Sequence, residues 1–453
     1  MKVKKRVFVT SAILFLFVFI YLCVIVSQNT NNLGFSIFAH ITFLVNIIVC
    51  CIFALADIQP LSLNKIFLYF NLFFLIIAPF MQYLSGFRIW NYSIDNNTYA
   101  YANILILLWI LVFELCYHRF SIRIRKKRNT MQTEITYDFT KLCILLILTV
   151  ICFAYMVKSI SFAGLFIRSS NYLNIDSAAA MQIIMGLCRS VPLYATIYAF
   201  RYSKQHKNGY LFFLVSLVST ILLNFPTSVA RYWLAIVYIG LLLTFFEKKL
   251  KDRTFDFIII VIFIIVFPVF QLFKWYGLDI LSNADVIIGQ LSSIYNNADF
   301  DAYSMFARTI IYVKENGFNF GSQLLSIIFF IIPRSIWPSK PYPTGQLISS
   351  AQGQDFTNLS CPMIAEGYFA FGIIGVVLFA FIFSYVTAYF DVSKEKNDNN
   401  YSIVNFIYPF LFGVYVYIQR GSVQPAVVYT FSFYVFLIIC YCCKKFIKLL
   451  VGR

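Results

Sequence analysis

The chain has 453 residues, of which 60% are hydrophobic and only 12% are charged. Soluble globular domains carry about 25% charged residues, so this composition excludes an ordinary soluble protein. The formal net charge is +17, but most of the basic residues lie in short segments between apolar runs. That distribution argues against nucleic acid as a partner.

Apolar stretches of about 20 residues recur along the whole chain, which is typical of membrane-spanning helices. The first stretch has no small-residue cleavage site, so we interpret it as a span and not as a removed signal. The pattern predicts an all-α polytopic integral membrane protein with about twelve transmembrane helices. The expected spans are 7–27, 35–56, 64–84, 99–118, 140–159, 181–200, 210–225, 231–247, 255–276, 363–389, 401–419 and 425–443.

The basic residues predict the orientation of these spans. By our count, 25 of the 36 Lys and Arg lie in the two terminal segments and in every second connection. The positive-inside rule therefore places both termini in the cytoplasm. Seven of the other eleven are arginine, whose planar guanidinium grips phosphate or carboxylate and is less costly to dehydrate than an ammonium group. This bias suggests an anionic ligand on the outer face.

One connection is much longer than the others. Residues 277–362 separate the expected ninth and tenth spans and form a large outer loop, and a smaller outer loop lies near 160–180. The chain therefore divides into spans one to nine at 1–276, the large loop, and spans ten to twelve with a basic tail at 363–453. Long loops of aromatic and apolar composition are more often functional than disordered.

Two helices are expected inside the large loop. Phe300, Ser304, Ala307 and Ile311 fall on one face of a helix, so their segment predicts an amphipathic helix. The apolar run at 324–332 is too short to cross a membrane and ends before a proline, which predicts a re-entrant or interfacial helix.

The stretch 331–345, IIPRSIWPSKPYPTG, follows this run and contains four prolines. Because proline fixes φ and stops helices, we expect a stiff extended loop that presents Arg334 and Lys340 to a membrane-bound phosphate. Trp337 and Tyr342 suit the headgroup level and are also able to stack on sugar rings. The alternative is an aromatic anchor whose cations only snorkel to the interface.

Two further arginines stand at the expected outer mouths of spans. Arg231 lies in NFPTSVARYW between spans seven and eight, and Arg420 lies in YIQRGSVQP between spans eleven and twelve. Arginine is costly in such places, so both are candidate ligand-binding residues, with a structural counter-ion as the alternative. Gly421 allows close backbone approach beside Arg420.

The acidic residues offer candidate bases. Asp299 and Asp301 have the Asp-x-Asp spacing, but on a helix they point roughly 200° apart and do not converge on one metal ion. Asp301 either acts as a base or pairs with Arg308, seven residues later on the same face. Glu366 begins the expected tenth span, where a helix dipole stabilises it, and it is our preferred base.

Several kinds of chemistry are absent from the sequence. It contains no His/Cys metal cluster, no Ser-His-Asp set, no Walker loop and no dinucleotide fingerprint. This excludes kinases, ATP-driven pumps and flavoproteins, and we expect no metal or other cofactor.

Several of these features together resemble the bacterial O-antigen polymerases, the Wzy-type repeat-unit polymerases. Arg334 and Gly345 match the R-x10-G pattern of that family's outer loops, and PRSIWPSKP followed by EGYFAFGIIG is similar to its C-terminal region. RGS at Arg420 is similar to the RG between its last helices. The smaller loop keeps only Arg168 and no R-x10-G pattern.

The resemblance implies a GT-C-like glycosyltransferase in the bacterial inner membrane. It would join undecaprenyl-diphosphate-linked oligosaccharide units at the periplasmic face, with membrane lipids, a flippase and a chain-length-regulating co-polymerase as partners. We assign the diphosphate to Arg231, Arg334, Lys340, Arg420 and Arg308, the base to Glu366 or Asp301, and sugar contacts to Trp337 and Tyr342. A lipid-linked oligosaccharide flippase or other secondary transporter, and an O-antigen ligase, are the alternative functions.

Overall fold

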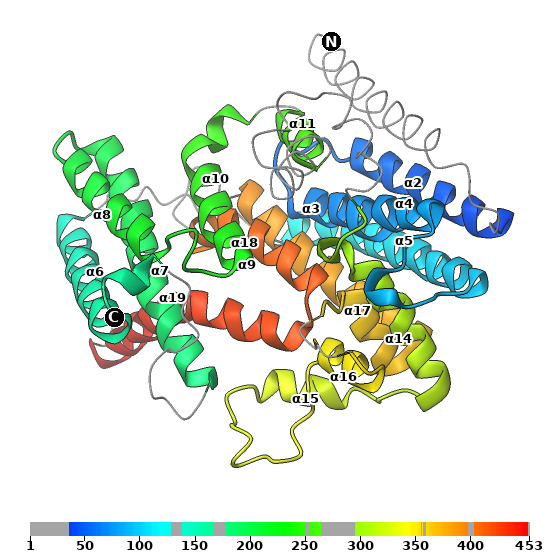
Figure 1. Ribbon diagram of the computed structural model, residues 1–453. Coiled ribbons are helices and arrows are strands. Elements are labelled where there is room, and N and C mark those ends of the chain that lie inside the picture. Colours follow the sequence, from blue (N-terminus) through cyan, green and yellow to red (C-terminus); the bar gives the residue numbers. More distant parts are fainter. Residues whose placement is uncertain are drawn as a thin grey trace, which may run out of the picture.

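The structure is a computed structural model that describes residues 36–127, 138–166, 178–250, 253–263, 295–354, 356, 359–396 and 403–451. In this part of the chain all regular secondary structure is helical, as predicted (Figure 1). The expected first span, and the second half of the expected ninth, lie outside the described residues.

Six described helices are long and apolar enough to cross a membrane, namely 37–56, 63–85, 96–126, 139–160, 183–205 and 363–396. Three shorter apolar helices cover 209–223, 232–246 and 423–437. Each of them overlaps an expected span, which supports a multi-pass membrane protein. The number twelve stays a prediction.

The first group of helices surrounds α5 (Asn96–Lys127) and consists of α2 (Ile37–Ala56), α3 (Leu63–Phe70), η1 (Asn71–Ile77), α4 (Ala78–Ser85) and α17 (Met363–Lys396). Ser36 and Ser62 cap α2 and α3, because their hydroxyl oxygens accept hydrogen bonds from backbone N–H groups of the first turn. Packing between helices is largely aromatic, and the ring of Phe67 stacks on that of Phe113 with centroids 3.5 Å apart.

The second group consists of α6 (Phe139–Ile160), α7 (Ala178–Gln205), α8 (Gly209–Leu223) and α19 (Val423–Val451), with α7 in contact with the other three. Between the groups lie α9 (Arg231–Leu234), η4 (Ala235–Ile239), α10 (Gly240–Phe246) and α18 (Ile403–Arg420) (Figure 1). The short helix α11 (Thr254–Val261) packs at the edge of the first group.

Two π-helical segments interrupt the α-helices on either side of α18. The segment η1 continues α3 into α4, and η4 continues α9 into α10. At η4 the approach is very close, since a Cβ at Gly413 of α18 would lie 2.5 Å from the backbone nitrogen of Ile236. Such π segments widen a helix locally and are frequent at functional sites.

Helix α17 differs from the uninterrupted span expected at 363–389. It bends at Phe371 and Gly372, and Gly372 adopts a φ of 62°, which a residue with a side chain rarely adopts. Beyond the bend the helix continues to Lys396, and Gly375 packs directly on Gly367. The residues before the bend therefore form a short separate turn of helix that carries Glu366.

The described part of the large loop is mostly helical. It contains η8 (Ala298–Phe300), α14 (Ala302–Asn316), α15 (Ser322–Ile328) and α16 (Thr344–Ala351). The predicted helices near 300–316 and 324–332 are both present, although α15 is shorter than expected. Helix α14 is not amphipathic in its setting: its first nine residues are all buried, because α5, η1, α16 and α17 pack around it.

A buried hydrogen-bond network around Asp391 joins the start of α3 to α5, α17 and α18. Asp391, near the end of α17, accepts hydrogen bonds from the backbone N–H groups of Leu63 and Asn64 and from the hydroxyls of Tyr117 and Tyr408. A carboxylate from a distant helix therefore caps the start of α3.

Candidate functional site

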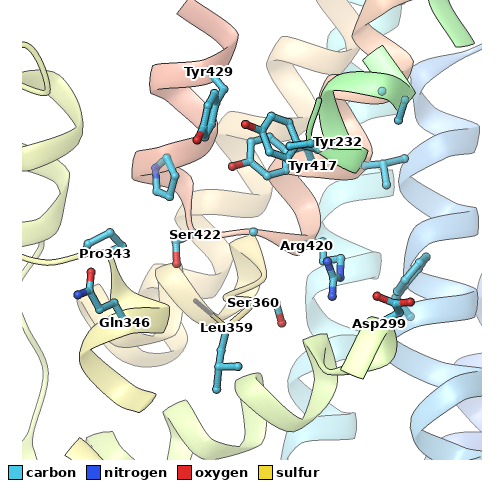
Figure 2. Close-up of a pocket in the computed structure, with 17 residues that line it drawn as sticks. Tyr232, Asp299, Pro343, Gln346, Leu359, Ser360, Tyr417, Arg420, Ser422 and Tyr429 are labelled. Carbon is cyan, nitrogen blue, oxygen red and sulfur yellow. The ribbon is translucent and has the colours of Figure 1, made fainter. Parts of the chain in front are cut away.

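A pocket of about 600 Å³ lies where α18 ends and α19 begins. Further walls come from α9, from the starts of η4 and α16, and from η1 (Figure 2). The segment around η8 and the residues Leu359 and Ser360 complete the lining. The lining residues that the argument uses are Tyr232, Asp299, Ser360, Tyr417, Arg420 and Tyr429.

Arg420 supplies the cation of this pocket. Its Nη2 donates hydrogen bonds to the carbonyl oxygen of Ala298 and to Oδ1 of Asp301, both at 3.2 Å. Its Nε has no hydrogen-bond partner in the described residues, and its side chain is 36% exposed. The guanidinium is therefore held from one side by Ala298 and Asp301, while its exposed part lines the pocket.

Asp301 orients this guanidinium and is itself firmly bound. Its carboxylate is 2% exposed and accepts hydrogen bonds from Ser360 Oγ at 2.7 Å, from the Ser360 backbone N–H at 3.3 Å and from Arg420. Cys361, the residue after Ser360, donates its backbone N–H to the carbonyl oxygen of Arg420 at 3.1 Å. The 360–361 segment thus fixes both members of the ion pair.

Asp299 faces the pocket directly, unlike Asp301. The two aspartates flank Phe300, whose fully buried ring packs on Phe74 and Tyr295. The backbone N–H of Asp299 donates to Oδ1 of Asn297 at 2.8 Å, which closes the turn. This turn directs one carboxylate into the pocket and the other into the protein.

Three tyrosines from three helices form the opposite wall (Figure 2). The rings of Tyr232 and Tyr417 stack with centroids 4.2 Å apart and an interplanar angle of 16°. The ring centroids of Tyr429 and Tyr232 are 4.6 Å apart. We call these three residues the tyrosine wall. The pocket therefore has an aromatic side and a charged side, as ligand pockets often do.

Gly345 packs against the pocket residues Leu359, Ser360 and Ser422 and has no room for a side chain. Its backbone N–H donates to Ser422 Oγ at 3.0 Å. A Cβ at this position would lie 2.7 Å from the carbonyl oxygen of Leu359 and 3.1 Å from that of Ser360. Close backbone approach is thus a physical reason for glycine at the end of the R-x10-G pattern.

Glu366, the preferred base from the sequence, is 4% exposed and does not line the described pocket. Its carboxylate accepts hydrogen bonds from Thr344 Oγ1 and, at 3.0 Å, from the backbone N–H of Val423. These contacts join the start of α16 to the start of α19. In this structure Glu366 braces two elements that form the pocket wall.

Arg334 and Lys340 fold the proline-rich loop back on itself. Arg334 donates hydrogen bonds to the carbonyl oxygens of Lys340 and Pro341, and its guanidinium lies 3.9 Å from the ring centroid of Tyr342. Lys340 Nζ donates to the carbonyl oxygens of Phe330 and Ile332 at 2.8 and 2.9 Å. Burial, and secondly the nearby Arg334 guanidinium, lower the pKa of Lys340.

The aromatic residues of this loop also lie away from the pocket in the described structure. Trp337 donates its Nε1–H to Ser339 Oγ, and the side chain of Tyr342 is 52% exposed. The loop nevertheless ends at Pro343, which does line the pocket. Its residues therefore act on the described pocket through the position of α16.

The last two candidates occupy different places. Arg308 is fully buried in α14, 4.5 Å from the ring centroid of Tyr92, and does not line the pocket. Burial lowers its pKa, and Asp301 pairs with Arg420 instead of Arg308. Arg231 is the first residue of α9, between the pocket residues Ala230 and Tyr232, but its side chain lies outside what the structure describes.

The sequence interpretation missed the tyrosine wall and the two serines at 360 and 422. One signal was present, since Tyr417 precedes Arg420 by three residues and therefore shares its helix face. The chain contains 31 tyrosines, however, so this spacing alone does not single one out.

Among the described residues, no three His, Cys, Asp or Glu side chains lie close enough together to hold a metal ion. Comparisons with protein-family models, with curated proteins and with solved structures find no match. The argument for function therefore depends on the site itself.

Proposed function

We propose that this chain is a membrane glycosyltransferase that polymerises undecaprenyl-diphosphate-linked oligosaccharide units. The pocket lies at the junction of α18 and α19, which the charge distribution of the sequence assigns to the non-cytoplasmic side of the membrane. In this proposal the donor diphosphate binds Arg420 and a sugar ring lies against the tyrosine wall.

The oriented guanidinium of Arg420 is the observation that carries this proposal. Its Nη2 is anchored by Ala298 and Asp301, whereas its Nε lacks a protein partner in the described residues. The side chain is nevertheless 36% exposed and lines the pocket, so the exposed part of the guanidinium is open to an anion there. Phosphate suits this position because guanidinium and phosphate form charge-assisted hydrogen bonds.

The same geometry suits the chemistry of glycosyl transfer. When the bond between the sugar C1 and the phosphate oxygen breaks, its electron pair leaves with the lipid diphosphate. A fixed donor at a developing oxyanion contributes about 2.7–4 kcal/mol in well-studied enzymes. Because the fixed guanidinium of Arg420 supplies positive charge here, we expect activity to survive treatment with a chelator.

The test is a glycolipid ladder from a deletion strain complemented with the full chain. Wild type should restore long polymer, whereas Arg420→Ala should leave single lipid-linked repeat units. Arg88→Ala is the matched control, because Arg88 is an exposed arginine that does not line the described pocket. It should give the wild-type ladder at equal protein level.

Each alternative function predicts a different result. Loss of an O-antigen ligase leaves no capped core at all, whereas loss of a polymerase leaves core with one repeat unit. Loss of a flippase leaves repeat units on the cytoplasmic side, out of reach of periplasmic enzymes. Either pattern in the deletion strain, or a normal ladder from Arg420→Ala, would contradict the proposal.

A further inference from the structure

The two aspartates that flank Phe300 differ in their access to the pocket. The carboxylate of Asp301 is buried and accepts hydrogen bonds from Ser360 and Arg420. Asp299 is half-buried and lines the pocket on the same side as Arg420 (Figure 2). Among the described residues that line this pocket, Asp299 supplies the one carboxylate.

The backbone around Asp299 is held on both sides. The carbonyl oxygen of Ala298 accepts a hydrogen bond from Arg420, and the ring of Phe300 is fully buried. The Asp299 N–H is bound by Asn297. The backbone of Asp299 is therefore held in place beside the Arg420 guanidinium. A catalytic group needs such support from its neighbours.

We propose that Asp299 is the general base of the glycosyl transfer and that Asp301 is a positioning residue for Arg420. This inference rests on the proposed function. The acceptor hydroxyl oxygen attacks C1 of the donor sugar, and the bond from C1 to the diphosphate oxygen breaks. The hydroxyl proton passes to the Asp299 carboxylate, and the lipid diphosphate leaves with the electron pair of the broken bond.

Access decides between the candidate bases. A general base must come within hydrogen-bond reach of the proton that it removes. Glu366 is 4% exposed and Asp301 is 2% exposed, and neither of them lines the described pocket. Asp299 instead opens to a pocket of about 600 Å³.

The experiment uses the purified full chain in nanodiscs, with lipid-linked repeat units extracted from the deletion strain as substrate. Asp299→Asn should lower kcat about 100-fold or more while KM changes less than about threefold, because base catalysis contributes about 10²–10⁴-fold. Asp95→Asn is the matched control. Asp95 is exposed and caps the start of α5 by accepting the Thr98 N–H, and asparagine caps equally well.

Two further variants separate catalysis from positioning. Added formate should restore part of the turnover of Asp299→Ala, because a small carboxylate fits the space left by the side chain. Asp301→Asn should raise KM and lower kcat together, since Arg420 loses its charged partner, and formate should not rescue it.

The outcomes distinguish the inference from the proposed function. If wild type does not polymerise the extracted units, the proposed function fails. If wild type is active and Asp299→Asn keeps its kcat within about threefold, or formate does not rescue Asp299→Ala, then Asp299 is not the base and the inference is overturned.

Discussion

Replacing Asp301 by alanine removes the acceptor of three hydrogen bonds from a site that is 2% exposed. Hydrogen bonds to a charged group contribute about 1.5–3 kcal/mol, and the 2.7 Å bond from Ser360 Oγ should lie within that range. The ion pair with Arg420 contributes about 1 kcal/mol or less, because the arginine side chain is 36% exposed. The 3.3 Å bond from the Ser360 N–H adds less.

Because these contacts share one carboxylate, their energies do not simply add, and we expect Asp301→Ala to lower the free energy of unfolding by about 3 kcal/mol. The assay is unfolding of the full chain in mixed micelles by SDS titration, followed by the fluorescence of its five tryptophans. Asp299→Asn is the comparison and should cost less than about 1 kcal/mol, since that residue opens to the pocket.

Asp301→Asn provides a second measurement if the alanine variant fails to fold. Its amide oxygen still accepts one hydrogen bond from Ser360, so about half of the loss is expected. If Asp301→Ala costs less than about 1 kcal/mol, or if Asp299→Asn costs as much as Asp301→Ala, then the assignment of the buried role to Asp301 is wrong.

Three more predictions concern residues that support the walls of the pocket without lining it. Arg334→Lys should lose polymer almost as completely as Arg334→Ala, because a lysine lacks the planar guanidinium that binds two carbonyl oxygens and covers the ring of Tyr342. A full-length ladder from the lysine variant would mean that charge alone matters. Gly345→Ala should destabilise the protein by about 1–3 kcal/mol and abolish polymer, since the new methyl group meets two carbonyl oxygens; a wild-type melting temperature would refute this. Glu366→Gln should lower the melting temperature, because the charged acceptor for Thr344 and Val423 is lost, and it should leave kcat far above that of Asp299→Asn. A kcat as low as in Asp299→Asn at unchanged stability would favour Glu366 as the base.

The multi-pass helical character of the fold was predictable from the sequence, because it depends on apolar length. The bend at Gly372 and the π segments η1 and η4 were not predictable in this way. All three lie within apolar runs whose hydropathy is the same for straight and distorted helices. Two of them coincide with close packing, at Gly413 beside η4 and at Gly372 against Phe318, and one sequence alone does not contain that information.

The site was predictable only in part. Arg420 stood out because arginine is costly at the mouth of a span, and the structure places it in the pocket. The partner of Asp301 was harder to predict. Spacing favoured Arg308, but residues seven apart on a helix are about 10.5 Å apart along its axis, and direct pairs form at three or four. The observed partner is 119 residues away in sequence, so only the tertiary fold brings the two together.

The central claim is that Arg420 holds a lipid diphosphate in this pocket, and the most direct measurement is the binding of undecaprenyl diphosphate to the purified full chain in nanodiscs. The account predicts saturable binding by wild type and by Arg88→Ala, and binding at least about tenfold weaker by Arg420→Ala, equivalent to 1.4 kcal/mol or more. Equal affinity of wild type and Arg420→Ala for undecaprenyl diphosphate would contradict it.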